Sequence, residues 1–200
     1  MRIGKVVKSN SHCDYLVQVD ELTDFLDAPR SEDYGFGTFV KLEDGKKHWA
    51  VALVYNSQLI NPNFNNLGPR LTSEPDPVFA PDLIVETRTV LGTVLIGSLD
   101  SDLDGVYGVQ GIPLVVVPVD TPVVKMTPTE IHAFHRNGEG RSQFTYYSHL
   151  LQAGGIFARQ LAYQVLQELV QSNLFSGPEE RALLVLSKDL AWRNTMGAMR

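Results

Sequence analysis

The hydrophobic pattern of this chain changes its period once, near Thr121, and this change constrains the fold more than any other feature. Before it, apolar residues alternate with polar ones or form short runs at residues 3–7, 15–19, 35–42, 48–55 and 83–99. Such segments, bounded by turn residues, are typical of strands. After it, apolar residues recur at the 3.6-residue spacing of helices. The sequence therefore predicts an α+β protein.

We expect about six strands, which form a small N-terminal antiparallel β-barrel. Residues 43–46 contain Asp44-Gly45, a dipeptide that favours a hairpin turn. Residues 114–119 are the last expected strand, and Pro113 and Pro118 restrict it to an edge or a bulge because proline cannot donate to a ladder. The proline-rich residues 56–82 are expected to form a long loop, which is either functional or a surface insertion.

The C-terminal part is expected to be a helical segment over residues 123–200, after a barrel domain over residues 1–122. Thr127 as N-cap, Pro128 at the first helical position and Glu130 as the capping-box partner predict a helix start. A longer helix is expected over about residues 142–173, and another after Pro178.

One face of the expected long helix is a candidate interface. Its apolar residues share a 3.6-residue period, which places them on one stripe. That stripe packs either on the barrel of the same chain or on another chain, since an amphipathic helix normally faces its own core. The interface candidates are Phe144, Tyr147, Leu151, Phe157 and Leu161.

Charge and composition exclude several classes of protein. The formal net charge of −6 argues against a chain-wide electrostatic surface for nucleic acid, so no direct nucleic-acid partner is expected. Cys13 is the single cysteine, so no intrachain disulfide can form. No apolar run reaches the length of about 20 residues that a membrane span needs, and the first residues do not resemble a signal peptide. We expect a cytoplasmic protein.

Three alternating carboxylates make a candidate metal site. Asp100, Asp102 and Asp104 precede Gly105, as in the first half of a calcium loop. A complete EF-hand loop also needs a bidentate glutamate at its twelfth position, and Gly111 stands there. The favoured interpretation is a solvated turn between strands, because aspartate and glycine favour turns.

Other chemical motifs are incomplete. His132 and His135 share one helix face, but a zinc site needs further ligands, and the near candidates are Glu130, Glu139 and His149. The sequence holds no G-x-x-x-x-G-K-[ST] phosphate loop and no G-x-S-x-G nucleophile elbow. We therefore expect no cofactor and no catalytic residues.

The first two thirds of the chain resemble the HAS-barrel family, the small β-barrel at the N-terminus of HerA-type ATPases and of ATP synthase subunits. Residues 1–19 look like the family's first two strands, and residues 34–56 look like its central hairpin. Residues 94–131 look like its closing strands and its proline-marked exit to a threonine-capped segment. In that family a Walker-type ATPase core follows the barrel, whereas helices follow it here, so no catalytic residue is carried over.

The resemblance implies a contact module, since HAS barrels pack side by side around a ring and touch neighbours or accessory proteins. We expect a non-catalytic assembly or adaptor protein that binds a protein partner or associates with itself. Two alternatives stay open. One is a small-molecule or metal-binding protein, an enzyme included. The other is an accessory factor of a HerA-like DNA-processing ring ATPase.

Overall fold

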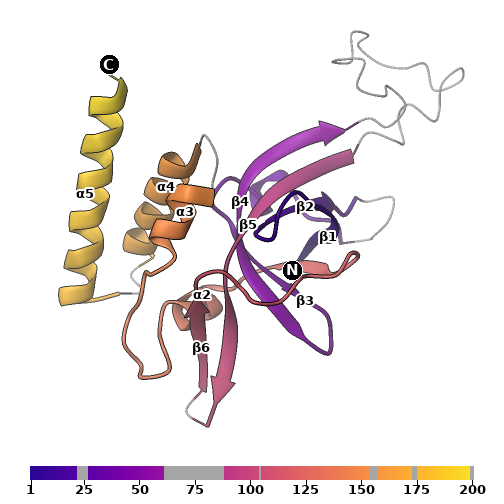
Figure 1. Cartoon of the computed structure of the whole chain (residues 1–200), viewed down its shortest axis with the longest axis horizontal. Helices are drawn as coiled ribbons and strands as arrows, with labels where there is room; N and C mark the ends of the chain where they lie inside the picture. Colours follow the sequence, from indigo (N-terminus) through magenta and orange to yellow (C-terminus); the bar gives the residue numbers. More distant parts are fainter. Residues whose placement is uncertain (22–26, 61–87, 104, 154–156, 173–174, 199–200) are drawn as a thin grey trace, which may run out of the picture.

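The protein is an α+β structure built on a β-barrel. Its computed structural model describes residues 1–21, 27–60, 88–103, 105–153, 157–172 and 175–198. Within these residues, seven strands form one antiparallel sheet in the order β2-β1-β7-β3-β4-β5-β6. Pairing of β2 with β5 closes six of them into a barrel and leaves β6 outside. The helices gather on one side of the barrel (Figure 1).

Five of the strands, β1 to β5, overlap the expected segments, whereas β6 and β7 match no expected strand. The turn predicted at residues 43–46 joins β3 to β4, and Asp44 Oδ1 accepts hydrogen bonds from the backbone amides of Lys46 and Lys47 at 2.8 Å. The strands are β1 (Arg2–Ser9), β2 (Asp14–Val19), β3 (Phe39–Glu43), β4 (His48–Ile60), β5 (Arg88–Asp102), β6 (Gly105–Gln110) and β7 (Pro122–Lys125).

Two expectations about the barrel segments are wrong. Residues 114–119 form no strand, and β7 closes the barrel instead by pairing with β1 and β3. Pro113 just before this segment and Pro118 within it lack the amide donors that a ladder needs. The long loop expected at residues 56–82 does not begin at residue 56, because β4 pairs with β5 as far as Ile60. The rest of that loop lies outside the described residues.

The central strands are apolar along their length because both of their faces are buried. On β4, Ala50 and Ala52 belong to the core inside the barrel. Val51 and Leu53, which alternate with them, belong to a second core between the barrel and the helices. The period-two alternation of a strand thus divides one apolar run between two cores.

Helix α2 (Pro128–Phe134) follows β7 directly and starts as the sequence predicts. The side chain of Thr127 accepts a hydrogen bond from the Glu130 amide, and the Glu130 carboxylate accepts one from the Thr127 amide, which completes the capping box. Before α2, a short 3-10 helix, η1 (Ser31–Asp33), lies between β2 and β3.

The long helix expected at residues 142–173 is wrong, because the segment holds two helices. These are α3 (Tyr147–Ala153) and α4 (Ala158–Gln171), and α5 (Pro178–Ala198) comes after them. Residues 142–146 are not helical because they bond to β6. The Thr145 amide donates to Gln110 Oε1 at 2.7 Å, and Gln110 Nε2 donates to the Gln143 carbonyl at 3.3 Å.

The helices share a core with the barrel. Leu150 of α3 and Leu161 and Leu166 of α4 are fully buried in the same cluster as Val94 and Ile96 of β5. Helix α5 lies farthest from the barrel and packs against α4 (Figure 1). None of the helices in the described parts of the chain is long and apolar enough to span a membrane.

The pairing of β5 with β4 ends at Gly97, and the rest of β5 pairs with β6 as a hairpin. The close approach of α2 requires glycine at Gly108, where an added Cβ would lie 1.9 Å from the Phe134 carbonyl oxygen. The predicted turn between strands joins β5 to β6, with Asp102 paired to Gly105. The hairpin projects from the barrel beside α2 (Figure 1).

Candidate functional site

The segment between β6 and β7 presents apolar side chains to solvent. We call residues 112–119 the apolar loop. The exposed fraction is 97% for Leu114 and 64% for Val116. Ordinary surfaces carry single exposed apolar residues, whereas a run of them marks a contact site. The exposed members of the loop are Ile112, Leu114, Val115, Val116 and Val119.

The barrel holds the apolar loop at both of its ends. His12 Nε2 donates to the Pro113 carbonyl at 2.7 Å, and the Val117 amide donates to the hydroxyl of Tyr15 at 3.2 Å. Both Pro113 and Val117 are buried, and the three residues between them are exposed to solvent. The loop is ordered before any partner binds, which lowers the entropy cost of association.

The end of the loop is joined to β1. The Asp120 amide donates to the Val6 carbonyl at 2.8 Å, and the Val6 amide donates to the Thr121 carbonyl at 3.0 Å. The Lys5 ammonium lies 3.1 Å from the Asp120 carboxylate. These bonds fix where the chain turns from the apolar loop into β7.

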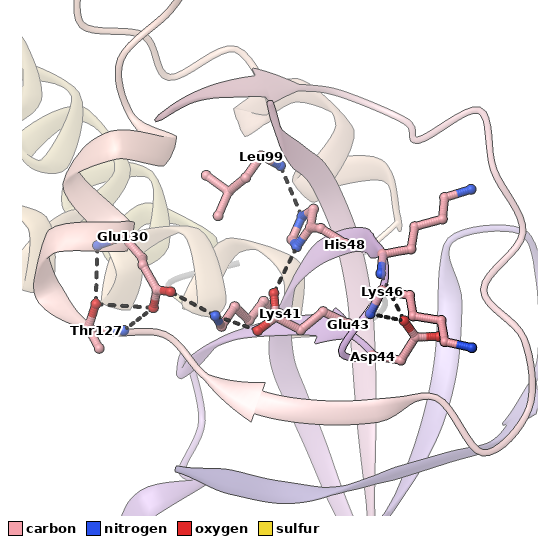
Figure 2. A network of polar contacts seen from close by, with 9 residues as sticks. Lys41, Glu43, Asp44, Lys46, His48, Leu99, Thr127 and Glu130 are labelled. Carbon is pink, nitrogen blue, oxygen red and sulfur yellow. Dashed lines mark hydrogen bonds and ion pairs between the residues drawn. The ribbon is translucent and has the colours of Figure 1, made fainter. Parts of the chain in front are cut away.

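A charged cluster lies between the barrel and α2. We define it as Lys41, Glu43, His48 and Glu130 (Figure 2). The Lys41 ammonium donates to Glu130 Oε1 at 2.7 Å and also pairs with Glu43. Burial by itself lowers the pKa of Lys41, but the hydrogen bonds to Glu130 and Glu43 outweigh it, so the pKa is raised. Lys41 is therefore charged near neutral pH.

His48 links the cluster to β5. The Leu99 amide donates to His48 Nε2 at 3.0 Å, so the ring proton sits on Nδ1, which lies 3.5 Å from Glu43 Oε2 (Figure 2). Burial is the main cause of the lowered pKa of His48. The imidazole is therefore neutral near pH 7 and holds β5 where it diverges from β4.

The cluster lines an open cleft of about 390 Å³, together with Asp100 and Ser101 of β5. A histidine beside a glutamate resembles two parts of a catalytic triad. However, the Leu99 amide occupies the nitrogen that would have to accept a proton from a nucleophile. Among the described hydrogen bonds, none joins Ser101 Oγ to His48. The hydrogen bonds of the cluster link β3, β4, β5 and α2 to one another, and they do not activate Ser101 as a nucleophile.

The structure describes two of the predicted metal residues, and both lie near the tip of the β5–β6 hairpin. Asp100 and Asp102 end β5, and Asp104 lies outside the described residues. Each of the two described carboxylates accepts a hydrogen bond from a nearby amide, from Ser101 to Asp100 and from Gly105 to Asp102. Over the described part of the chain, no group of three or more His, Cys, Asp or Glu residues is placed to hold a metal ion.

The histidines considered for zinc point to different partners. His135 is buried, its Nδ1 donates to the Ile131 carbonyl at 2.7 Å and its Nε2 lies 2.9 Å from the Tyr146 hydroxyl. His132 accepts from Arg136 Nε, and His149 donates to the Leu95 carbonyl. His132 and His135 both contact the ring of Phe175, but each of the three histidines is hydrogen-bonded to a different partner.

Four of the five interface candidates pack on their own chain. Leu161 is fully buried between α4 and the barrel, and Phe144, Tyr147 and Leu151 are partly buried against the same core. Phe157 differs, because 48% of it is exposed. Its ring lies 6.5 Å from that of Phe36. The predicted stripe thus mainly covers its own barrel.

Sequence reasoning missed both the apolar loop and the charged cluster. Residues 114–119 were expected to form an edge or bulged strand because their composition is that of a strand. The prolines at 113 and 118 were the signal against that interpretation. The cluster joins residues 41 and 130, which are far apart in the sequence, and no local pattern reveals such a pair.

Comparison with known families finds a match along the chain. A family model described as a domain of unknown function (DUF8166) matches residues 1–200. No curated protein matches the chain.

Proposed function

The chain belongs to the DUF8166 family, and we propose that it acts as a non-catalytic assembly protein that docks on another protein through the apolar loop. The observation that carries this proposal is the ordered exposure of Leu114, Val115 and Val116 between two buried anchors. Full burial of such a side chain contributes about 1.5–3 kcal/mol. A partner that covers the loop therefore gains hydrophobic free energy at little ordering cost.

The surface around the loop supports the same role. Val106 and Val109 on β6, the strand that precedes the loop, are also exposed. An interface core of this kind is depleted of charge and surrounded by polar residues. The resemblance to HAS barrels supports a protein partner or a second copy, and a ring ATPase is one such partner.

The test is loss of the contact when charge is placed on the loop. We expect Leu114→Asp and Val116→Asp to remove a protein that co-purifies from the native host, or to remove self-association seen by light scattering. Leu59→Asp is the matched control, because Leu59 on β4 is an exposed leucine outside the loop. All three variants are expected to melt within a few degrees of the parent protein, since each residue is exposed.

Two outcomes contradict the proposal. One is an unchanged set of partners and an unchanged oligomeric state in both loop variants. The other is an equal loss in the Leu59→Asp control, which points to a general effect of added charge.

A further inference from the structure

A small pocket lies where the segment after α2 meets the start of α5. Its volume is about 250 Å³. This is below the range of about 300–1,000 Å³ that is usual for drug-sized ligands, so it suits a small head group. Four rings line it, those of His135, Phe144, Tyr147 and Phe175.

The rings are packed around one another with different orientations. Phe144 stacks on His135 at 6.3 Å, and Phe175 meets His135 edge to face at 5.8 Å. The ring of Tyr147 lies 5.8 Å from that of Phe144. An aromatic ring is negative on its face, so a lining made of several rings attracts a cation that enters among them.

The charges of the pocket favour the same kind of ligand. Glu179, on the first turn of α5, is the single charged residue among the described residues that line the pocket. Burial lowers the pKa of His135 to about 4, so its ring is neutral near pH 7 and does not repel a cation. Both ring nitrogens of His135 already have partners in Ile131 and Tyr146. Recognition is therefore left to the aromatic rings and to one carboxylate.

We infer that this pocket binds an organic cation of the methylated-ammonium type. The methyl groups fit an apolar lining completed by Leu183 and Leu186, and the positive charge faces the rings and Glu179. An anionic ligand has no positively charged partner among the described lining residues. Methylated ammonium groups are weakly hydrated compared with a primary ammonium, and aromatic cages recognise them.

The test compares choline with its uncharged isostere, in which carbon replaces the quaternary nitrogen. Titration calorimetry measures affinity, and the proton NMR signal of the choline methyl groups reports ring-current shifts inside an aromatic pocket. We expect choline to bind at least about fivefold more tightly than the isostere. Tyr147→Leu and Glu179→Gln should each weaken choline binding by about threefold or more.

Glu180→Gln is the matched control, because Glu180 is the next residue on α5 and does not line the pocket. It should leave choline affinity unchanged. Equal binding of choline and the isostere overturns the inference, and so does the absence of any methyl shift at millimolar choline. Thermal melting of each variant shows that it is folded before its affinity is compared.

Discussion

Replacement of Lys41 by methionine tests the charged cluster. Lys41→Met keeps the aliphatic length of the side chain but leaves Glu43 and Glu130 without their shared cation. The side chains are 15% exposed for Lys41 and 29% exposed for each glutamate. Their burial is intermediate between that of exposed ion pairs, which contribute about 0–1 kcal/mol, and that of buried pairs, whose breakage costs about 3–5 kcal/mol. We expect the free energy of unfolding to fall by about 2 kcal/mol.

Urea denaturation followed by circular dichroism measures this loss. Lys46→Met is the control, because Lys46 is exposed at the β3–β4 turn and should change stability by no more than about 0.5 kcal/mol. The triple variant with Glu43→Gln and Glu130→Gln should recover part of the loss, since it removes the unpaired carboxylates. A loss below about 1 kcal/mol for Lys41→Met, or no recovery in the triple variant, would show that these charges do not stabilise the fold through each other.

Three further predictions concern the helix that covers the β5–β6 hairpin. Gly108→Ala should destabilise the protein by about 2 kcal/mol or more in urea melts, because its Cβ would clash with the Phe134 carbonyl. A parent-like melt would refute that clash. Thr127→Ala should cost about 1 kcal/mol through loss of the cap to Glu130, while Thr127→Ser should cost less. His135 has a folded pKa of about 4 and an unfolded value of about 6.5, so the unfolded chain binds the proton first. Stability should therefore fall by about 3 kcal/mol as the pH drops from 6.5 to 4, and a His135→Asn variant should show a smaller fall across that window.

Local signals predicted the local structure well. The Asp44 turn and the Thr127 cap formed as expected, because each depends on bonds between residues at most three apart. Five of the six barrel strands, β1 to β5, were also expected, since apolar alternation or a short apolar run indicates a strand, whereas β7 was not. A barrel was expected through the HAS-barrel resemblance, but the pairing of β2 with β5 that closes it was not predicted.

Errors arose where tertiary contacts outweighed composition. Residues 114–119 have a strand composition, yet prolines remove their donors and the buried anchors of Pro113 and Val117 hold them as a loop. Residues 142–146 continue a helical apolar period, yet Gln110 of β6 binds their backbone. In both places, a bond to a distant strand decided the conformation.

The sequence by itself determined the class of the protein, because hydrophobic period, turn residues and caps act over a few neighbouring residues. Only the tertiary structure decided which apolar residues are buried and which charges meet. Leu114 and Leu161 are the same residue type, yet one is 97% exposed on the apolar loop and the other is fully buried. Burial depends on which elements pack together, and the pairing of Lys41 with Glu130 depends on the closure of the barrel beside α2.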